Sequence, residues 1–105
     1  MHGIAQIVDV SAPINNRVVT FQPPDHLMKY IFHKGFIALD GTSLTVIDTD
    51  KLNKNFTVGF IPETLRVTTF RFKGKGDWVN IEVDLQTQTI VDTVERVLEE
   101  RGVLS

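Results

Sequence analysis

Residues 35–46 read GFIALDGTSLTV, and this stretch decides the fold of the chain. Its first half, Phe36–Leu39, is a short apolar run of the length that fills a strand. Asp40 and Gly41 follow, a pair that readily takes positive φ and marks a tight reversal between strands. The second half, residues 42–48, alternates between polar and apolar side chains, as a strand with one buried face does. The stretch therefore predicts a β-hairpin.

Two hydroxyl groups lie side by side on the second strand of this hairpin. Because successive side chains of a strand point to opposite faces, Ser43 and Thr45 share one face with Ile47, and Leu44 and Val46 occupy the other. Such a pair of donors and acceptors could bind a flat heterocycle that carries carbonyl groups and ring nitrogens. The spacing alone favours a plainer interpretation, since Ser and Thr are common on the solvated face of a half-buried strand.

The length and overall composition predict a single globular domain. The chain has 105 residues, 42% of them hydrophobic, and a formal net charge of −2. It contains no basic block, so nothing in it indicates nucleic acid as a partner. No apolar run approaches the ~20 residues that a membrane span needs. The first residues do not form a signal peptide, which would place a charged segment before an apolar core.

Residues with metal-binding or redox chemistry are scarce. The chain has no cysteine, which excludes disulfides, thiolate metal sites and a cysteine nucleophile, and fits a cytoplasmic protein. The histidines at positions 2, 26 and 33 lack the spacing of a metal site. We therefore expect no metal site, and we assign no role to these histidines.

Further periodic segments accompany the hairpin. Alternation predicts strands, and two segments with helical spacing predict a short and a long helix. The predicted strands are Gly3–Val10, Arg17–Phe21, Phe36–Leu39, Thr42–Asp48, Phe56–Ile61 and Trp78–Asp84, and the predicted helices are Asp25–Ile31 and Gln86–Arg101.

The long helix carries one apolar stripe of five residues. Thr89 and Asp92 resemble a capping box at its start, and Gly102 is suited to the position after its end. An uncovered stripe of this size is a liability for a monomer, so it either packs on its own barrel or meets another subunit. The sequence leaves these two alternatives open. The stripe consists of Ile90, Val91, Val94, Val97 and Leu98.

Six short strands followed by one helix predict a small all-β fold. We expect a six-stranded antiparallel barrel over residues 1–85, with the terminal helix over residues 86–105, as one domain. Closure of such a barrel removes the sheet edges through which strands aggregate.

Four blocks of the sequence closely resemble one family. They are KGFIALDGTSLTV (34–46), FIPETLRVTTF (60–70), WVNIEVD (78–84) and QTQTIVDTVERVL (86–98). Together they resemble the lumazine-binding barrel of riboflavin synthase, most closely the C-terminal of that enzyme's two barrels. The blocks occur in the family's order and spacing and cover nearly all of the chain.

This resemblance implies a Greek-key barrel and a specific reaction. In the family, two molecules of 6,7-dimethyl-8-ribityllumazine dismutate to riboflavin and a ribitylaminopyrimidinedione, and no metal or organic cofactor takes part. The active site forms between the N-terminal barrel of one subunit and the C-terminal barrel of a neighbour. The enzyme is usually a trimer held largely by its C-terminal helices.

The resemblance also implies site residues, position by position. Ser43 and Thr45 match hydroxyls that contact the pteridine, and this reverses the plainer interpretation above. Lys34 and Asp84 match a lysine and an aspartate of the site, and we expect both, with Ser43, to act in catalysis. The remaining expected substrate-binding residues are Leu44 on the strand and the segment Ile61, Pro62, Glu63, Thr64, Leu65 and Arg66.

The chain departs from the family because it carries one barrel where the enzyme has two. We interpret it as an excised C-terminal domain with an added start methionine, and we expect little or no turnover from it alone. Two other interpretations stay open. One is a lumazine- or flavin-binding module without turnover, and the other is an assembly domain whose pocket is empty in isolation.

Overall fold

The computed structural model describes residues 2–11, 17–60 and 73–102. They form six strands, one 3₁₀ helix and one α-helix. The strands are β1 (His2–Ser11), β2 (Arg17–Gln22), β3 (Phe36–Leu39), β4 (Thr42–Asp50), β5 (Asn55–Phe60) and β6 (Trp78–Val83). The helices are η1 (Asp25–Tyr30) and α2 (Leu85–Glu100).

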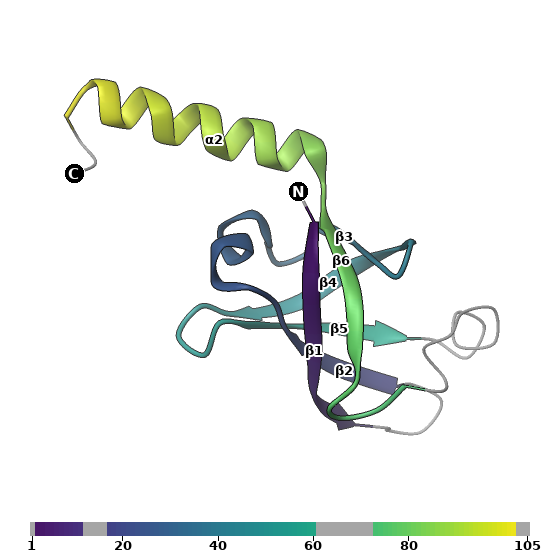
Figure 1. The fold of residues 1–105 in the computed structure, drawn as a ribbon. Coiled ribbons are helices and arrows are strands. Elements are labelled where there is room, and N and C mark those ends of the chain that lie inside the picture. The colour runs from purple at the N-terminus through teal and green to yellow at the C-terminus, as the bar shows by residue number, and fades with distance from the viewer. Residues whose placement is uncertain (1, 12–16, 61–72, 103–105) are drawn as a thin grey trace.

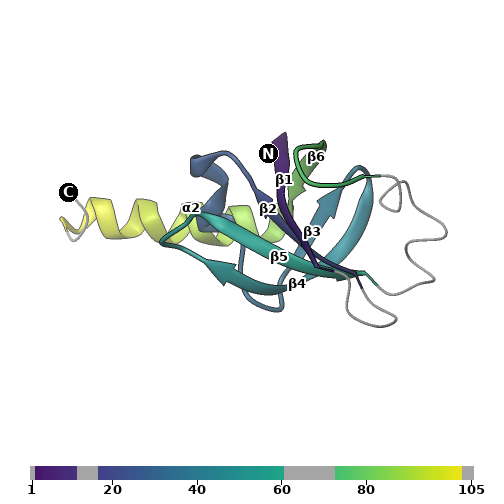
Figure 2. The same ribbon diagram turned by 90° about the horizontal axis from the view of Figure 1, so that it is seen from below.

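The six strands close into an antiparallel barrel in the order β1-β2-β5-β4-β3-β6 (Figures 1 and 2). β3, β4 and β5 are consecutive neighbours, and β6 returns to lie beside β3, which is a Greek-key arrangement. Each strand pairs on both sides, so the described barrel exposes no free edge. The predicted fold class is confirmed.

The apolar side chains that alternate along the strands fill the interior of the barrel. In β6 the apolar side chains Val79, Ile81 and Val83 are buried, and the residues between them are exposed. Phe21 of β2 and Phe56 of β5 are each 0% exposed, and their rings stack with centroids 5.4 Å apart. These two rings are among the largest side chains of the core and cross-link neighbouring strands.

The turn between β3 and β4 has the backbone that the sequence predicts. Asp40 and Gly41 both take positive φ, 48° and 80°. The Asp40 carboxylate accepts a hydrogen bond from the Asn80 N–H (2.7 Å) and one from Lys73 Nζ (2.7 Å). The turn residue thus ties the hairpin to β6, which fixes the place of β3 between β4 and β6.

Most element boundaries differ from the prediction by one residue, and β4 and the short helix differ more clearly. β4 continues to Asp50, and its Val46–Asp48 segment contains a register shift against β5. The predicted short helix is a 3₁₀ helix that ends at Tyr30. Lys51 Nζ donates hydrogen bonds to the Met28 carbonyl in this helix and to the carbonyl of its C-cap residue, Ile31. Partial burial of this ammonium group lowers the pKa of Lys51.

The predicted capping box of the long helix is wrong. The helix begins at Leu85, and its N-cap is Asp84, whose carboxylate accepts a hydrogen bond from the Thr87 N–H. Asp92, the proposed partner of Thr89, instead accepts a hydrogen bond from the hydroxyl of Tyr30. Gly102 has a φ of 73° just after the helix, as predicted.

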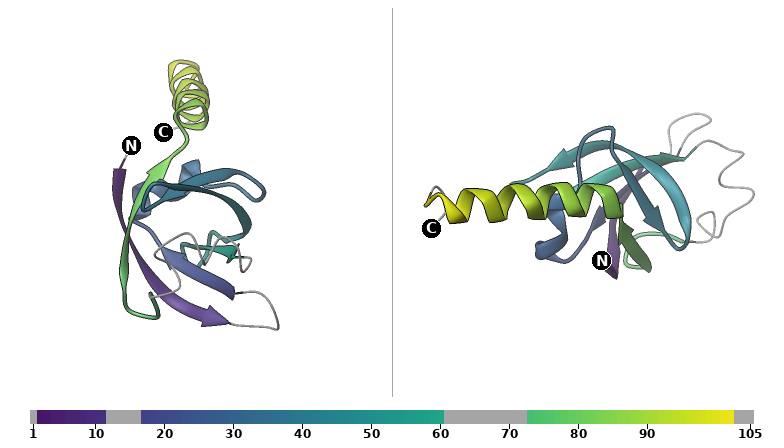
Figure 3. Two further views of the ribbon diagram at one scale, coloured as in Figure 1. Left: turned by 90° about the vertical axis from the view of Figure 1, so that its right-hand side faces the viewer. Right: turned by 90° about the horizontal axis from the view of Figure 1, so that it is seen from above.

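α2 lies across one end of the barrel, and its C-terminal part projects beyond it (Figures 1 and 3). Two polar contacts attach it to η1, namely the bond from Tyr30 to Asp92 and an ion pair between Lys29 and Glu95 (2.9 Å). None of its residues is buried, and Ile90 is 64% exposed. The described chain therefore leaves most of the predicted apolar stripe uncovered. Within the described ranges, no helix is long and apolar enough to cross a membrane.

Candidate functional site

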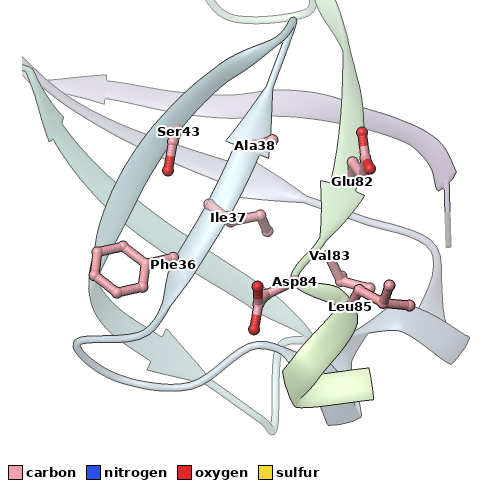
Figure 4. Close-up of a pocket in the computed structure, with 8 residues that line it drawn as sticks. All are labelled: Phe36, Ile37, Ala38, Ser43, Glu82, Val83, Asp84 and Leu85. Carbon is pink, nitrogen blue, oxygen red and sulfur yellow. The ribbon is translucent and has the colours of Figure 1, made fainter. Parts of the chain in front are cut away.

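A pocket of about 220 Å³ opens on the outer face of the barrel, over β4, β3 and β6 (Figure 4). It extends from the middle of these strands to the start of α2. Its lining mixes aromatic, hydroxyl and carboxylate side chains. The lining residues are Phe36, Ile37, Ala38, Ser43, Glu82, Val83, Asp84 and Leu85.

The strand register explains why residues distant in sequence meet here. Ala38 of β3 lies opposite Ser43 of β4 on one side and opposite Glu82 of β6 on the other. Paired residues of neighbouring strands point to the same face of the sheet. The outward side chains therefore form a row in which the small Ala38 lies between two polar groups, and this small side chain leaves room for a ligand.

A second outward row lies next to the first. Phe36 is opposite Thr45 in the register, and its ring is 67% exposed at the edge of the pocket. Ile37 pairs with Val83 in antiparallel strands. The next residue along the chain after Val83, Asp84, therefore lies toward Phe36, the residue before Ile37. An exposed aromatic ring beside hydroxyl and carboxylate groups is suited to a flat, polar ligand.

The structure brings two of the predicted site residues into this pocket, Ser43 and Asp84. Thr45 lies on the same exposed face of β4 as Ser43, as the alternation predicts. Leu44 is half-buried, packs against the core and is not a lining residue of the pocket.

The other predicted site residues do not line the described pocket. Lys34 is exposed in the turn before β3, where its φ of 66° is unusual for a residue with a Cβ atom. The Lys34 N–H donates to the Val46 carbonyl (2.8 Å), which fixes this turn against β4. The predicted segment Ile61–Arg66 lies outside the described residues.

Asp84 has a double position, at the pocket and at the start of α2. Its Oδ2 accepts hydrogen bonds from the backbone N–H (3.0 Å) and the hydroxyl (2.9 Å) of Thr87. Figure 4 shows the carboxylate where β6 passes into the helix, on the side of the pocket. The sequence predicted Asp84 as a site residue that ends a strand, but did not predict its role as a cap.

Six of the eight lining residues were not predicted as site residues, among them Phe36, Ala38 and Glu82 with outward side chains. Glu82 shares the outer face with Ser43 only because β3 pairs with β6, a contact between segments far apart in the chain. The alternation along β6 places Glu82 on the outward face, but it gives no indication of the strand beside it. The pocket has two carboxylates and, among its described lining residues, no cation. It therefore suits a ligand that offers N–H or O–H donors.

Another hollow, of about 330 Å³, lies over β1 and the connection from β2 to η1. Its lining includes Trp78, Pro23 and Pro24, and none of the predicted site residues belongs to it. No group of three His, Asp or Glu side chains within the described ranges could hold a metal ion.

Comparison with known proteins relates this chain to riboflavin synthases. It is 50% identical over 98 residues to the riboflavin synthase of Escherichia coli strain K12, an alignment with 92% of this chain and 45% of that enzyme. It is 49% identical over 82 residues to the riboflavin synthase of Chlamydia pneumoniae, covering 78% of this chain and 40% of that enzyme. The chain thus spans less than half the length of these relatives.

Solved structures of LumP share the barrel. LumP complexed with 6,7-dimethyl-8-(1'-D-ribityl) lumazine superposes with a TM-score of 0.71 and 22% identity, over 79% of this chain and 45% of LumP. LumP complexed with riboflavin gives a TM-score of 0.73 and 21% identity, over 80% of this chain and 44% of LumP. At this level of identity the likeness concerns the fold. The sequence profile of the lumazine binding domain matches residues 1–84, and the chain therefore belongs to the lumazine-binding domain family.

Proposed function

We propose that this chain is the lumazine-binding barrel of a riboflavin synthase and that it binds 6,7-dimethyl-8-ribityllumazine over β4 and β3. The observation that carries the proposal is the meeting of Ser43 and Asp84 in one pocket beside the exposed ring of Phe36. The ligand has a flat ring with carbonyl groups and nitrogens, and a ribityl chain with hydroxyl donors. Hydroxyl, carboxylate and aromatic groups of the pocket complement these features.

The proposed reaction transfers a four-carbon unit between two lumazine molecules. The methyl group at ring position 7 is acidic, because its anion delocalises into the ring. A site must therefore hold the ring by hydrogen bonds, stabilise the developing charge and place two rings face to face. One barrel that binds one ring supplies half of this arrangement. We infer that a second barrel, from the remaining length found in the relatives, supplies the other half.

The exposed stripe of α2 supports an assembly of several copies. Ile90, Val94 and Val97 are 64%, 52% and 40% exposed on a helix that projects beyond the barrel. Contact with a neighbouring helix would remove this apolar surface from water. We propose a homo-oligomer, a trimer in the full enzyme, in which the helices of neighbouring subunits pack together.

A binding module without turnover is the second candidate. The fold likeness to LumP, which was solved with lumazine and with riboflavin, favours this alternative. Both candidates require a pteridine in the pocket, and they differ only in catalysis. Turnover therefore separates them, and binding does not.

A fluorescence titration of the 105-residue chain with 6,7-dimethyl-8-ribityllumazine tests the proposed function. We expect saturable binding, with little riboflavin formed by the chain alone and more formed after an N-terminal barrel of a relative is added. Binding without turnover in either mixture would favour the binding module. An unchanged ligand signal at every protein concentration would reject both candidates.

Phe36 offers a second test of the pocket. Replacing this exposed ring by alanine is expected to weaken lumazine binding about two- to tenfold, because an aromatic contact contributes about 0.5–1.5 kcal/mol. Phe36→Tyr should retain the affinity. Phe32→Ala removes a ring that is 46% exposed outside the pocket and serves as the control. Equal affinities of the Phe36 and Phe32 alanine variants would show that the ligand does not touch Phe36.

A further inference from the structure

We propose that Thr87, on the first turn of α2, is a positioning residue that orients the Asp84 carboxylate, so that the oxygen it does not hold stays available to the ligand. This inference rests on the proposed function, because it concerns how the same pocket holds its lumazine. Thr87 itself is not among the lining residues of the pocket. It acts on the ligand only through the carboxylate that it holds.

The hydrogen bonds around Asp84 carry the argument. Both donors of Thr87, the N–H at 3.0 Å and the hydroxyl at 2.9 Å, bond to the same oxygen, Oδ2. Two donors on one oxygen restrict the rotation of the carboxylate about its last bond. Among the described residues, none donates a hydrogen bond to Oδ1 of Asp84. Oδ1 thus has lone pairs available to a ligand, and its residue lines the pocket.

The rest of α2 keeps this arrangement in place. Tyr30 is 4% exposed, and its hydroxyl donates to Asp92, two turns after Asp84. This hydrogen bond raises the pKa of Tyr30, so the neutral phenol, which can donate, persists to a higher pH than usual. Lys29 adds an ion pair to Glu95 one turn further. The middle of α2 is therefore held against η1, which limits movement of the helix start that carries Asp84.

The chemistry of the ligand agrees with a fixed acceptor. A ribityllumazine offers hydroxyl donors on its chain, and an ionised carboxylate is an acceptor only. Hydrogen bonds to a charged acceptor are stronger than those between neutral groups, and they depend on direction. An acceptor that is held in one orientation binds more tightly, because less freedom is lost on binding. We infer that Asp84 Oδ1 accepts a hydrogen bond from the bound ligand.

Two substitutions separate the capping role of Asp84 from its role at the pocket. Asp84→Ser retains an N-cap, since serine caps helices about as well as aspartate, but it has no second side-chain oxygen to offer the ligand. Thr87→Val has nearly the shape of threonine and keeps the backbone N–H bond, but loses the hydroxyl bond. We expect about tenfold weaker lumazine binding for Asp84→Ser and about threefold weaker binding for Thr87→Val.

Controls distinguish positioning from a merely structural role. Thr87→Ser keeps the hydroxyl and should restore the wild-type affinity. Thr89→Val changes an exposed threonine of the same helix outside the pocket and should have no effect on binding. In the double variant Asp84→Ser with Thr87→Val, the second substitution should add nothing, because Thr87 acts through Asp84. Thermal unfolding of every variant shows whether stability changes in parallel with affinity.

The measurement is the lumazine dissociation constant of each variant of the 105-residue chain, from fluorescence titration. If the unmodified chain does not bind lumazine, the proposed function is wrong, and this inference fails with it. If the unmodified chain binds and Thr87→Val binds as Thr89→Val does, only the positioning role is overturned. The same conclusion follows if the effects of Asp84→Ser and Thr87→Val are additive.

Discussion

Replacing Phe21 by alanine is expected to lower the free energy of unfolding by about 3–5 kcal/mol, the usual effect of removing a buried phenylalanine ring. The ring is 0% exposed and stacks on Phe56, so its removal leaves a cavity between β2 and β5. A domain of this size is stable by about 5–15 kcal/mol in total. The variant should therefore unfold at a much lower urea concentration, measured by far-ultraviolet circular dichroism.

Phe36→Ala is the matched control for this experiment. It removes the same side chain from a strand of the same barrel, but Phe36 is 67% exposed on the outer face. Its cost should stay within about 1 kcal/mol, the range over which side chains differ in strand propensity. If the two variants were equally stable, Phe21 would not lie in the buried interior of the barrel.

The double variant Ser43→Ala with Thr45→Val is expected to weaken lumazine binding roughly ten- to a hundredfold. Each hydroxyl should contribute one hydrogen bond to the ring, and a hydrogen bond contributes about 0.5–1.5 kcal/mol to binding. Valine keeps the branched shape of threonine, so β4 should fold as before. Fluorescence titration gives the affinities, and circular dichroism verifies that the barrel is intact.

The barrel offers a matched control elsewhere on its surface. The hydroxyls of Thr20 on β2 and Thr57 on β5 lie 3.3 Å apart, on strands that do not line the pocket. Thr20→Val with Thr57→Val removes the same number of hydroxyls at that place and should leave the affinity unchanged. An equal loss of affinity in both double variants would mean that the hydroxyls of β4 have no special role.

The local pattern of the sequence predicted most of the barrel. The alternation of Val79, Ile81 and Val83 predicted β6, and the positive φ of Asp40 and Gly41 was predicted from residue type alone. Such features depend on a few neighbouring residues, so a single sequence contains them. The start of α2 was predicted within one residue, but its N-cap was not, because neither Asp84 with Thr87 nor the predicted pair Thr89 with Asp92 has the Glu or Gln that marks a capping box.

The site could be predicted only in part, for a physical reason. Alternation within one strand places Ser43 and Thr45 on the same face, and the family resemblance, rather than this pattern, assigned both to the site. Phe36 and Glu82 were missed because the pocket depends on the pairing of β3 with β6, which no local pattern specifies. The roles of Lys34 and of residues 61–66 came from the family resemblance and stay predictions.

A crystal structure of the chain with 6,7-dimethyl-8-ribityllumazine tests the central claim most directly. We predict that the ring lies on the outer face of β4 and β3, with its polar atoms within hydrogen-bond distance of Ser43 Oγ and Thr45 Oγ1. A ligand in the hollow beside Trp78, with the Ser43 pocket empty, would contradict this account.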